Sequence, residues 1–476
     1  MAYPEIRLFI DGKWIARPGS PVLDPATEDV IGEVPHVTMQ QLDMAVAASE
    51  RGFKIWRETS PAKRGDIIRK ATQLLRERVK EIAHAITLEQ GKPLADAENE
   101  VLRGSELIAW DAEEGRRAYG RVIPGDHKFH QQVLREPIGP VAAFTPWSAP
   151  MSSAGRKLGG ALAAGCSVIL KASEETPAGA CALVKAFEDA GLPAGVVNLV
   201  FGDPDRISRH LIASPAIRLI TFTGSVPVGM HLAKLAAEVM KPTVMELGGH
   251  SPVIVCKDAD PAAAARMSVS AKFRNAGQVC ISPTRFLVHD SIFDGFADAF
   301  VAHSTAIKVG NGFDPATQMG PLANVRRLNA MEDFVADAKK HGGKARAGGE
   351  RIGNRGYFFQ PTVLADVPKE CSVMNIEPFG PIATLMRFRE LPEAIEEANR
   401  LPYGLAAYAL TNDSAATTQL TSQIDVGHFA VNHFGGGIPE SPFGGVKQSG
   451  IGREGGSEGL EAYQTLKYIS RQTIAS

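Results

Sequence analysis

The strongest constraint on the fold is an alternation of short apolar runs and helical stretches that begins at residue 141. The apolar runs contain few polar residues, which is typical of strands buried on both faces of a sheet. They lie at residues 141–144, 167–170, 196–200 and 219–222. Stretches with helical periodicity follow them at residues 156–164, 178–190, 206–213 and 228–240. Repeated β-α units with short connections predict a parallel, doubly wound sheet with right-handed crossovers.

The rest of the chain extends this α/β architecture on both sides. Helical periodicity covers residues 38–56 and 61–90, and beyond Pro252 the alternation of strands and helices resumes more loosely. A chain of 476 residues is longer than one hydrophobic core usually organises. We therefore expect two or three domains, with a second α/β domain after residue 252.

Charge and hydropathy exclude several classes of partner. Lysine and arginine number 51 against 53 aspartate and glutamate, giving a formal charge of -2 with no long run of either sign. Neither a nucleic-acid nor an anionic-membrane partner is expected. The first 14 residues lack the apolar core of a signal peptide, and no apolar run approaches the roughly 20 residues that span a bilayer.

The cysteines indicate the compartment. There are five, at positions 166, 181, 256, 280 and 371, and no two of them have C-x-x-C spacing. We expect a reduced, cytoplasmic protein without a metal site, in which any one cysteine could be a reactive thiol.

A glycine motif near the carboxyl end of the chain is rejected as a dinucleotide site. Residues 450–455 match G-x-G-x-x-G, but no apolar strand precedes them. Fewer than thirty residues follow, which is too short for the rest of a β-α-β unit and its ribose-binding acid.

Two strand-to-helix junctions are better candidates for binding a phosphate or a nucleotide. In residues 220–229 an apolar strand leads into Gly224 and Ser225 and then a helix, whose free amides could meet a phosphate. An ordinary capped strand-turn-helix would look similar. The second junction places Lys171 and Glu174 at the carboxyl end of a strand, where open α/β sheets bind ligands, although Lys171 alone could be a surface charge.

Three further residues suggest a reactive centre. Cys280 follows Gly277 and Gln278, and a glycine bend there would expose backbone amides near the sulfur, as a nucleophile that forms an oxyanion requires. Glu246 lies in an apolar strand, where burial would raise its pKa toward the range of a general base. Glu377 precedes Pro378 and an aromatic residue. A buried structural cysteine and two turn carboxylates are the plain alternatives.

Taken together, these segments resemble the NAD(P)-dependent aldehyde dehydrogenase superfamily over nearly the whole chain. The matching motifs are PW at 146–147, KASE at 171–174, FTGS at 222–225, ELGG at 246–249, GQVC at 277–280, EPFGP at 377–381 and PFGGVKQSG at 442–450. The resemblance implies a Rossmann-like coenzyme domain, an α/β catalytic domain and a small β oligomerisation segment in a homodimer or homotetramer. The implied ranges are 1–119 with 139–248, then 249–445, and finally 120–138 with 459–474.

The resemblance also implies a mechanism. Cys280 would attack the aldehyde as a thiolate, and Glu246 would activate the water that hydrolyses the resulting thioester. Because Glu246 is present, hydrolysis is favoured over acyl transfer to coenzyme A. Ser148 stands where the family has an asparagine that helps to hold the oxyanion.

The resemblance also implies which residues bind the coenzyme. The residues expected to bind the coenzyme are Trp147, Lys171, Glu174, Gly224, Ser225, Glu377 and Phe379. We expect NAD to be preferred over NADP, because a 2′-phosphate beside the Glu174 carboxylate would be repelled.

Among family members, the segments before and around the cysteine look most like succinate-semialdehyde dehydrogenases. Arg156 and Arg274 match two arginines that grip the substrate carboxylate there, which favours a semialdehyde substrate. Two departures are Gly437, where relatives have a serine, and Ala149, where they have an aromatic residue. They leave open a wider pocket for a longer or aromatic aldehyde. A weakly active member that uses its thiol for ester hydrolysis or only binds its ligand is a further alternative.

Overall fold

The computed structural model describes residues 1–472. The chain begins with two hairpins, formed by β1 (Leu8–Ile10) with β2 (Lys13–Ile15) and by β3 (Gly19–Leu23) with β4 (Val30–Pro35). Four helices follow, namely α1 (Met39–Glu58), α2 (Pro61–Glu77), α3 (Val79–Gln90) and α4 (Leu94–Glu114).

The helices start and end where local chemistry allows. Thr38 and Gln41 form a capping box at the start of α1, in which the side chain of each residue bonds the backbone of the other. The helical stretch expected over residues 61–90 is two helices, because Arg78 leaves the helical conformation between α2 and α3. Gly91 then ends α3 in the left-handed conformation that suits glycine.

The first sheet confirms the doubly wound arrangement predicted from the alternation. Its strand order is β2-β1-β9-β8-β7-β10-β11-β21, and the five central strands pair in parallel. These strands are β7 (Val141–Phe144), β8 (Val168–Lys171), β9 (Val197–Val200), β10 (Leu219–Gly224) and β11 (Thr243–Leu247). The alternating helices are α5 (Pro150–Ala164), α6 (Pro177–Asp189), α7 (Pro204–Ala213) and α8 (Val226–Glu238). Most residues of the five strands are buried, as the apolar runs indicated.

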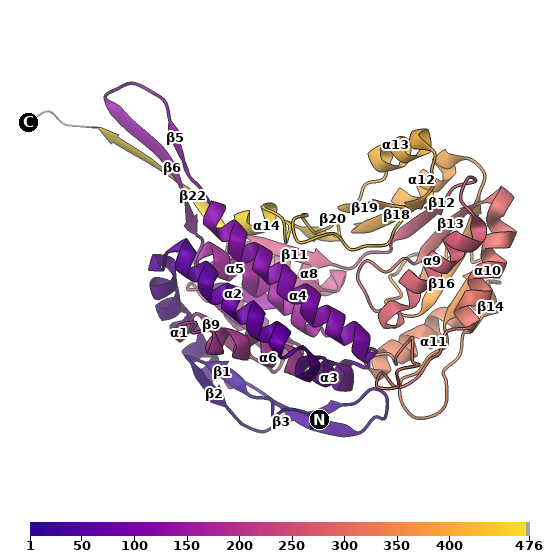
Figure 1. The fold of residues 1–476 in the computed structure, drawn as a ribbon, viewed down its shortest axis with the longest axis horizontal. Coiled ribbons are helices and arrows are strands. Elements are labelled where there is room, and N and C mark those ends of the chain that lie inside the picture. Colours follow the sequence, from indigo (N-terminus) through magenta and orange to yellow (C-terminus); the bar gives the residue numbers. More distant parts are fainter. Residues whose placement is uncertain (473–476) are drawn as a thin grey trace, which may run out of the picture.

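A second sheet occupies the other lobe of the molecule (Figure 1). Its order is β14-β15-β16-β13-β12-β18-β19, and all its pairings are parallel except the one at β14. The strands are β12 (Pro252–Val255), β13 (Arg285–His289), β14 (Lys344–Ala347), β15 (Thr362–Ala365), β16 (Ile382–Phe388), β18 (Ala406–Leu410) and β19 (His428–Val431). The helices are α9 (Pro261–Phe273), α10 (Phe293–Thr305), α11 (Val325–Lys340), α12 (Leu391–Asn399) and α13 (Ser414–Gln423).

The carboxyl-terminal part of the chain returns to the first lobe. β17 (Tyr403–Gly404) pairs with β20 (Val446–Lys447), and β21 (Gly450–Ile451) joins the edge of the first sheet beside β11. The first two residues of the rejected glycine motif therefore form a sheet edge, and the one helix described after the motif, α14 (Glu458–Glu461), has only four residues.

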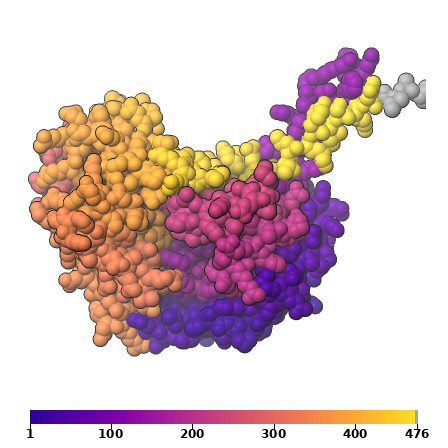
Figure 2. Space-filling view, turned by 180° about the vertical axis from the view of Figure 1, so that it is seen from behind, coloured from indigo at the N-terminus to yellow at the C-terminus, as the bar shows by residue number. Residues whose placement is uncertain are grey.

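A three-stranded arm projects from the body of the molecule (Figures 1 and 2). It consists of β5 (Arg121–Ile123), β6 (Phe129–Pro137) and β22 (Gln464–Gln472), and β22 pairs with β6 along its whole length. These strands fall in the two segments expected to support oligomerisation, of which residues 473–474 lie outside the described residues. Among the residues described, no helix has the length and apolar content needed to cross a membrane.

Candidate active site

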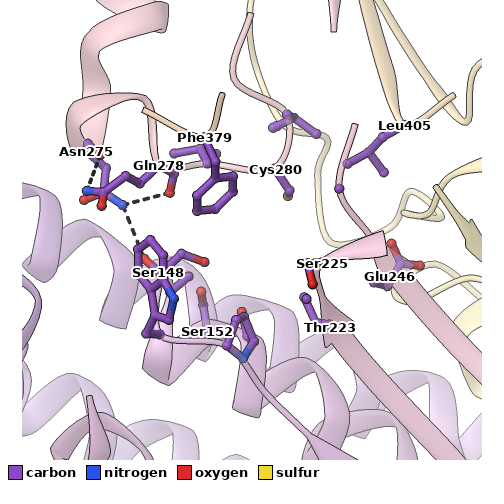
Figure 3. A pocket seen from close by; sticks show the side chains of 18 of the residues that line it. Ser148, Ser152, Thr223, Ser225, Glu246, Asn275, Gln278, Cys280, Phe379 and Leu405 are labelled. Carbon is purple, nitrogen blue, oxygen red and sulfur yellow. Dashed lines mark hydrogen bonds between the residues drawn. The ribbon is translucent and has the colours of Figure 1, made fainter. Parts of the chain in front are cut away.

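A cavity of about 830 Å³ is lined by segments of both lobes. It receives the loops after β7 and β10, the end of β11, the segment before β13 and the start of α11. The structure brings together there ten of the residues proposed from the sequence: Trp147, Ser148, Arg156, Gly224, Ser225, Glu246, Arg274, Cys280, Glu377 and Phe379. Lys171 and Glu174 are not in this lining and lie at and just beyond the carboxyl end of β8. Figure 3 shows Cys280, Glu246 and Ser148 among the lining side chains.

The loop before Cys280, the candidate nucleophile, has the bend that its glycine suggested. Asn275, Ala276 and Gly277 all have positive φ angles, of 49°, 53° and 71°. A β-carbon at Gly277 would lie 2.2 Å from the Gly380 carbonyl oxygen, so only glycine fits this turn. The Gln278 side chain donates to the Asn275 carbonyl at 3.1 Å and closes the loop on itself.

Cys280 is half-buried at the end of this loop. Burial, together with the nearby carboxyls of Glu377 and Glu246, raises the pKa of the Cys280 thiol to about 12. The sulfur is therefore a neutral thiol at neutral pH in this state, and a base must remove its proton before it can attack a carbonyl.

Glu246 has the environment expected of a general base. It lies in β11, is only 4% exposed, and its two carboxylate oxygens have no hydrogen-bond partner within residues 1–472. Burial raises the pKa of Glu246 well above its usual range, and the neighbouring Glu454 raises it further. The predicted direction of this pKa shift is confirmed.

A buried ion pair beside Glu246 was not anticipated from the sequence. Lys157 of α5 donates to the Glu454 carboxylate, and both side chains are almost completely buried. The positive charge of Lys157 lowers the pKa of Glu246 and so opposes the effect of Glu454. The sequence signal that could have pointed to this pair is a lysine, Lys157, within the otherwise apolar helical stretch at residues 156–164.

The first lobe provides a set of groups suited to a nucleotide. Lys171 Nζ lies 2.7 Å from a Glu174 carboxylate oxygen, and Glu174 also accepts the Gly202 N–H at 2.9 Å. Ser225 precedes the first residue of α8 but makes no capping hydrogen bond with its side chain within the described chain. Its hydroxyl and the first amides of α8 are thus available to a ligand in the cavity.

Glu377 and Phe379 complete this part of the cavity from the second lobe. The Glu377 carboxylate accepts the Gly249 N–H at 3.3 Å, and a β-carbon at Gly248 would lie 2.2 Å from it. Burial raises the pKa of Glu377 to about 8. The rings of Phe379 and Trp147 meet edge to face with centroids 5.5 Å apart.

Five arginines line the same cavity, at positions 103, 156, 274, 326 and 327. The Nη1 atom of Arg156 is buried without a hydrogen-bond partner in the described part of the chain, and its guanidinium lies 4.9 Å from the centre of the Phe443 ring. Arg274, directly after α9, also lines the cavity. Arg103 of α4 was not identified from the sequence, and it donates to the Gly437 carbonyl. Gly437 has φ of 76°, a conformation that a serine would rarely adopt.

The backbone of Ser148 is held firmly. Its carbonyl accepts hydrogen bonds from Lys92 Nζ at 3.0 Å and from Asn275 Nδ2 at 3.3 Å. Lys92 also pairs with Glu100 at 2.5 Å in a buried site. Neither Lys92 nor Asn275 was proposed from the sequence, because both act on a backbone atom far along the chain.

Comparison with known proteins shows the family to which the chain belongs. Residues 14–469 match the Aldehyde dehydrogenase family, and the chain belongs to this family. It is 47% identical to 4-(hydroxymethyl)benzenesulfonate dehydrogenase of Comamonas testosteroni over 97% of both chains. It is 38% identical both to 3-sulfolactaldehyde dehydrogenase of Pseudomonas putida and to the NADP-dependent succinate-semialdehyde dehydrogenase of Escherichia coli K12, over 97% of this chain and 96% of each relative.

Solved structures agree with this assignment. The NAD complex of an aldehyde dehydrogenase from Bacillus cereus matches with a TM-score of 0.96 at 33% identity, over 99% of this chain and 97% of that one. A 3,6-anhydro-L-galactose dehydrogenase in complex with NAP matches at 0.95 and 33% identity, over 98% of this chain and all of the other. The protein is therefore an enzyme that oxidises aldehydes with NAD(P), and the free α8 amides, the Ser225 hydroxyl and the Glu377 carboxylate fit that coenzyme.

Proposed function

We propose that this enzyme oxidises an aldehyde carrying a remote anionic group, a sulfonate or a carboxylate, to the corresponding acid, with NAD as the preferred coenzyme. The observation that carries the proposal is the Arg156 side chain in the cavity of Cys280, whose buried Nη1 has no partner in the described chain. A buried guanidinium nitrogen without an acceptor is unfavourable, and an anionic substrate group would supply the missing hydrogen bond.

The proposed reaction starts at Cys280. The Cys280 thiol loses its proton to solvent, and the sulfur adds to the aldehyde carbon to form a thiohemiacetal. The backbone N–H of Cys280 and the side chain of Ser148 hold the oxyanion. When bound, NAD(P)⁺ supplies the oxidant by accepting a hydride from that carbon. Glu246 then activates a water molecule that hydrolyses the thioester and releases the acid.

The coenzyme would extend from β8 to the nucleophile. Lys171 and Glu174 bind the adenine ribose, and Ser225 with the α8 amides binds the pyrophosphate at Gly224. Glu377 and Phe379 bind the nicotinamide ribose, with Trp147 packing against Phe379. Glu174 favours NAD, because its carboxylate accepts ribose hydroxyls and repels a 2′-phosphate.

Two substrate types fit an anionic site. The relative at 47% identity is named for an aromatic sulfonate, which favours 4-formylbenzenesulfonate, the aldehyde of the alcohol in that name. The small residues Ala149 and Gly436 in the lining leave room for a ring. The pair Arg156 and Arg274 and the relative at 38% identity favour succinate semialdehyde as the second candidate.

An aldehyde panel at fixed NAD tests the proposal. The panel contains 4-formylbenzenesulfonate, succinate semialdehyde, glutarate semialdehyde and uncharged benzaldehyde, and NADH formation is followed with and without coenzyme A. We expect the highest kcat/KM for an anionic aldehyde, with free acid as the product in both conditions. A higher kcat/KM for benzaldehyde would contradict the anionic substrate class. Formation of an acyl-CoA would contradict hydrolysis, and esterase activity without NADH would support the thiol-hydrolase alternative.

Three further assignments accompany the function. We propose that the two sheets are the cores of a coenzyme domain and a catalytic domain, and that the β5-β6-β22 arm joins subunits in a homodimer or homotetramer. Exposed apolar side chains on the arm, Val122, Leu466 and Tyr468, suit burial against another subunit. All five cysteines are free of disulfides, which suits the reduced cytoplasm.

A further inference from the structure

A second cavity of about 440 Å³ opens beside the catalytic one. The two cavities share three lining residues, namely Arg274, Val279 and Ile281. The second one, called here the outer cavity, is also lined by Arg266, Met267, Ser270, Ala271, Ser282, Pro283, Tyr408, His433 and Phe434. Because Val279 and Ile281 flank Cys280, the outer cavity borders the nucleophile loop.

The outer cavity is cationic. Arg266, Ser270 and Arg274 follow one another at four-residue spacing on α9 and just beyond it, so they lie on one face of that helix. Neither arginine makes an ion pair of 4.0 Å or less within residues 1–472, although the charge of Arg274 acts on Asp96 of the catalytic cavity. The described lining contains a histidine, His433, but no aspartate or glutamate. With no carboxylate in this lining, Arg266 leaves a site for an external anion, and Arg274 adds positive charge to the same cavity.

The opposite wall is aromatic. The ring of Phe434 lies 4.9 Å from that of Tyr408, centre to centre, and Tyr408 donates its hydroxyl to the Ile281 carbonyl at 2.7 Å. Tyr408 is buried, whereas Phe434 is half-buried. The Phe434 ring is thus supported from behind by a residue bonded next to Cys280. It offers a firm surface on which a substrate ring could pack.

We propose that the outer cavity binds the anionic end of an extended substrate, a sulfonate or carboxylate carried on an aromatic frame. Arg266 is the outer ligand for the anion, Arg274 is shared by both cavities, and the substrate ring packs on Phe434. This inference rests on the proposed function and adds the subsite that distinguishes long anionic aldehydes from short ones. The carboxylate of succinate semialdehyde, which is closer to its carbonyl, stays at Arg156 and Arg274.

The test uses Arg266→Gln, because Arg266 is exposed and lies outside the catalytic cavity. Arg76→Gln is the matched control, since Arg76 is another exposed helical arginine on α2 without an ion pair among the described residues. Steady-state kinetics with 4-formylbenzenesulfonate, 4-formylbenzoate, succinate semialdehyde and benzaldehyde are measured for each enzyme. Calorimetric titration with unreactive 4-methylbenzenesulfonate measures binding directly, and thermal denaturation checks folding.

For Arg266→Gln we expect KM to rise about 5- to 10-fold for both aromatic anions, in line with the loss of one charge-assisted hydrogen bond at a solvated site. Its kcat, its KM for succinate semialdehyde and its turnover of benzaldehyde should stay within about twofold of wild type. The affinity for 4-methylbenzenesulfonate should fall by a similar factor, while Arg76→Gln changes nothing. A rise confined to one of the two aromatic anions identifies sulfonate or carboxylate as the group recognised.

Equal changes for all four aldehydes, or no change for the aromatic anions and 4-methylbenzenesulfonate, would overturn the outer-cavity proposal. The proposed substrate class and the outer cavity can be refuted separately. If wild type favours benzaldehyde but binds 4-methylbenzenesulfonate through Arg266, the proposed substrate class is wrong and the outer cavity stands as an anion site. If wild type favours anionic aldehydes and Arg266→Gln changes neither the kinetics nor the binding of 4-methylbenzenesulfonate, the proposed function is supported and the outer-cavity proposal is wrong.

Discussion

The Asn275 side chain donates a hydrogen bond of 3.3 Å to the backbone carbonyl of Ser148. This bond joins the loop of the nucleophile to the loop after β7, which carries the proposed second oxyanion donor. Gln90 in turn donates to the Asn275 side-chain oxygen at 3.0 Å, so the amide of Asn275 is fixed in orientation. The position of the Ser148 backbone relative to Cys280 is therefore set by the fold, and the Ser148 side chain can be exchanged without moving either loop.

The separation of attack from hydrolysis predicts a trapped intermediate. Cys280→Ala should abolish dehydrogenation, because no other side chain in the cavity is proposed to form a covalent bond with the substrate. Glu246→Gln should slow hydrolysis by about 10² to 10⁴, the usual contribution of a general base. Mass spectrometry of Glu246→Gln after mixing with aldehyde and NAD should show an acyl group on Cys280. Unmodified protein that turns over at the normal rate would refute the assignment of Glu246.

The pH dependence of kcat follows from the environment of Glu246. A base acts only when deprotonated, and burial raises its pKa, so kcat should rise with pH through that raised pKa and be lost as the pH falls. Glu454→Gln removes the neighbouring negative charge that raises the pKa of Glu246 while Lys157 still lowers it. The rising limb of the pH profile should therefore move to lower pH. A shift to higher pH would show that Glu454 does not act on Glu246 through its charge, and thermal denaturation controls for damage to the buried ion pair.

Coenzyme preference should depend on Glu174. Wild type should have a higher kcat/KM for NAD than for NADP. Glu174→Gln should bring these two kcat/KM values closer together, because it removes the negative charge beside the 2′ position of the adenine ribose. Glu175→Gln is the matched control, because Glu175 pairs with Arg326 and Asn324 instead of Lys171. A wild-type preference for NADP, or an equal change in both variants, would contradict the role given to Glu174.

If Arg156 and Arg274 bind the substrate carboxylate, replacing them should raise KM more for a charged aldehyde than for an uncharged one. Arg156→Gln and Arg274→Gln should each raise KM for succinate semialdehyde about 10-fold, as expected for losing a charge-assisted hydrogen bond to the substrate carboxylate. The KM for a neutral aliphatic aldehyde of similar length should change by less than about threefold. If both substrates respond equally, Arg156 only packs on Phe443 and Arg274 only ends α9, as structural residues.

Most of the fold and much of the candidate site could be predicted from local patterns in the sequence. The bounds of strands β7 to β10 lie within two residues of the apolar runs, because strands buried on both faces must be continuously apolar. The break at Arg78 was missed, since helical periodicity continues through it. The pair Lys157 and Glu454 joins residues 297 positions apart, and no local pattern encodes such a contact. For the same reason, the outer cavity appears only when α9 and the loop after β19 lie side by side.

Replacing Ser148 by asparagine should make the enzyme faster on small aldehydes. The serine hydroxyl can donate to an oxyanion, but its side chain is one bond shorter than that of asparagine, a deficit of about 1.5 Å. The loop cannot move inward to compensate, because Lys92 and Asn275 hold the Ser148 carbonyl at 3.0 and 3.3 Å. Losing one oxyanion donor in a protease lowers kcat by about 10² to 10³, and a bridging water can recover part of such a loss.

We therefore expect Ser148→Asn to raise kcat for small aldehydes about tenfold, with the Cys280 backbone amide remaining the main donor in wild type. Pre-steady-state NADH bursts would show whether the gain lies in the formation of the thioester, where the oxyanion develops. Ser148→Ala is the matched control and should be slower than wild type if the hydroxyl donates directly or through water. A lower turnover of Ser148→Asn on 4-formylbenzenesulfonate or succinate semialdehyde, whichever wild type prefers, would mean that the serine is fitted to this substrate and that its short reach is no handicap.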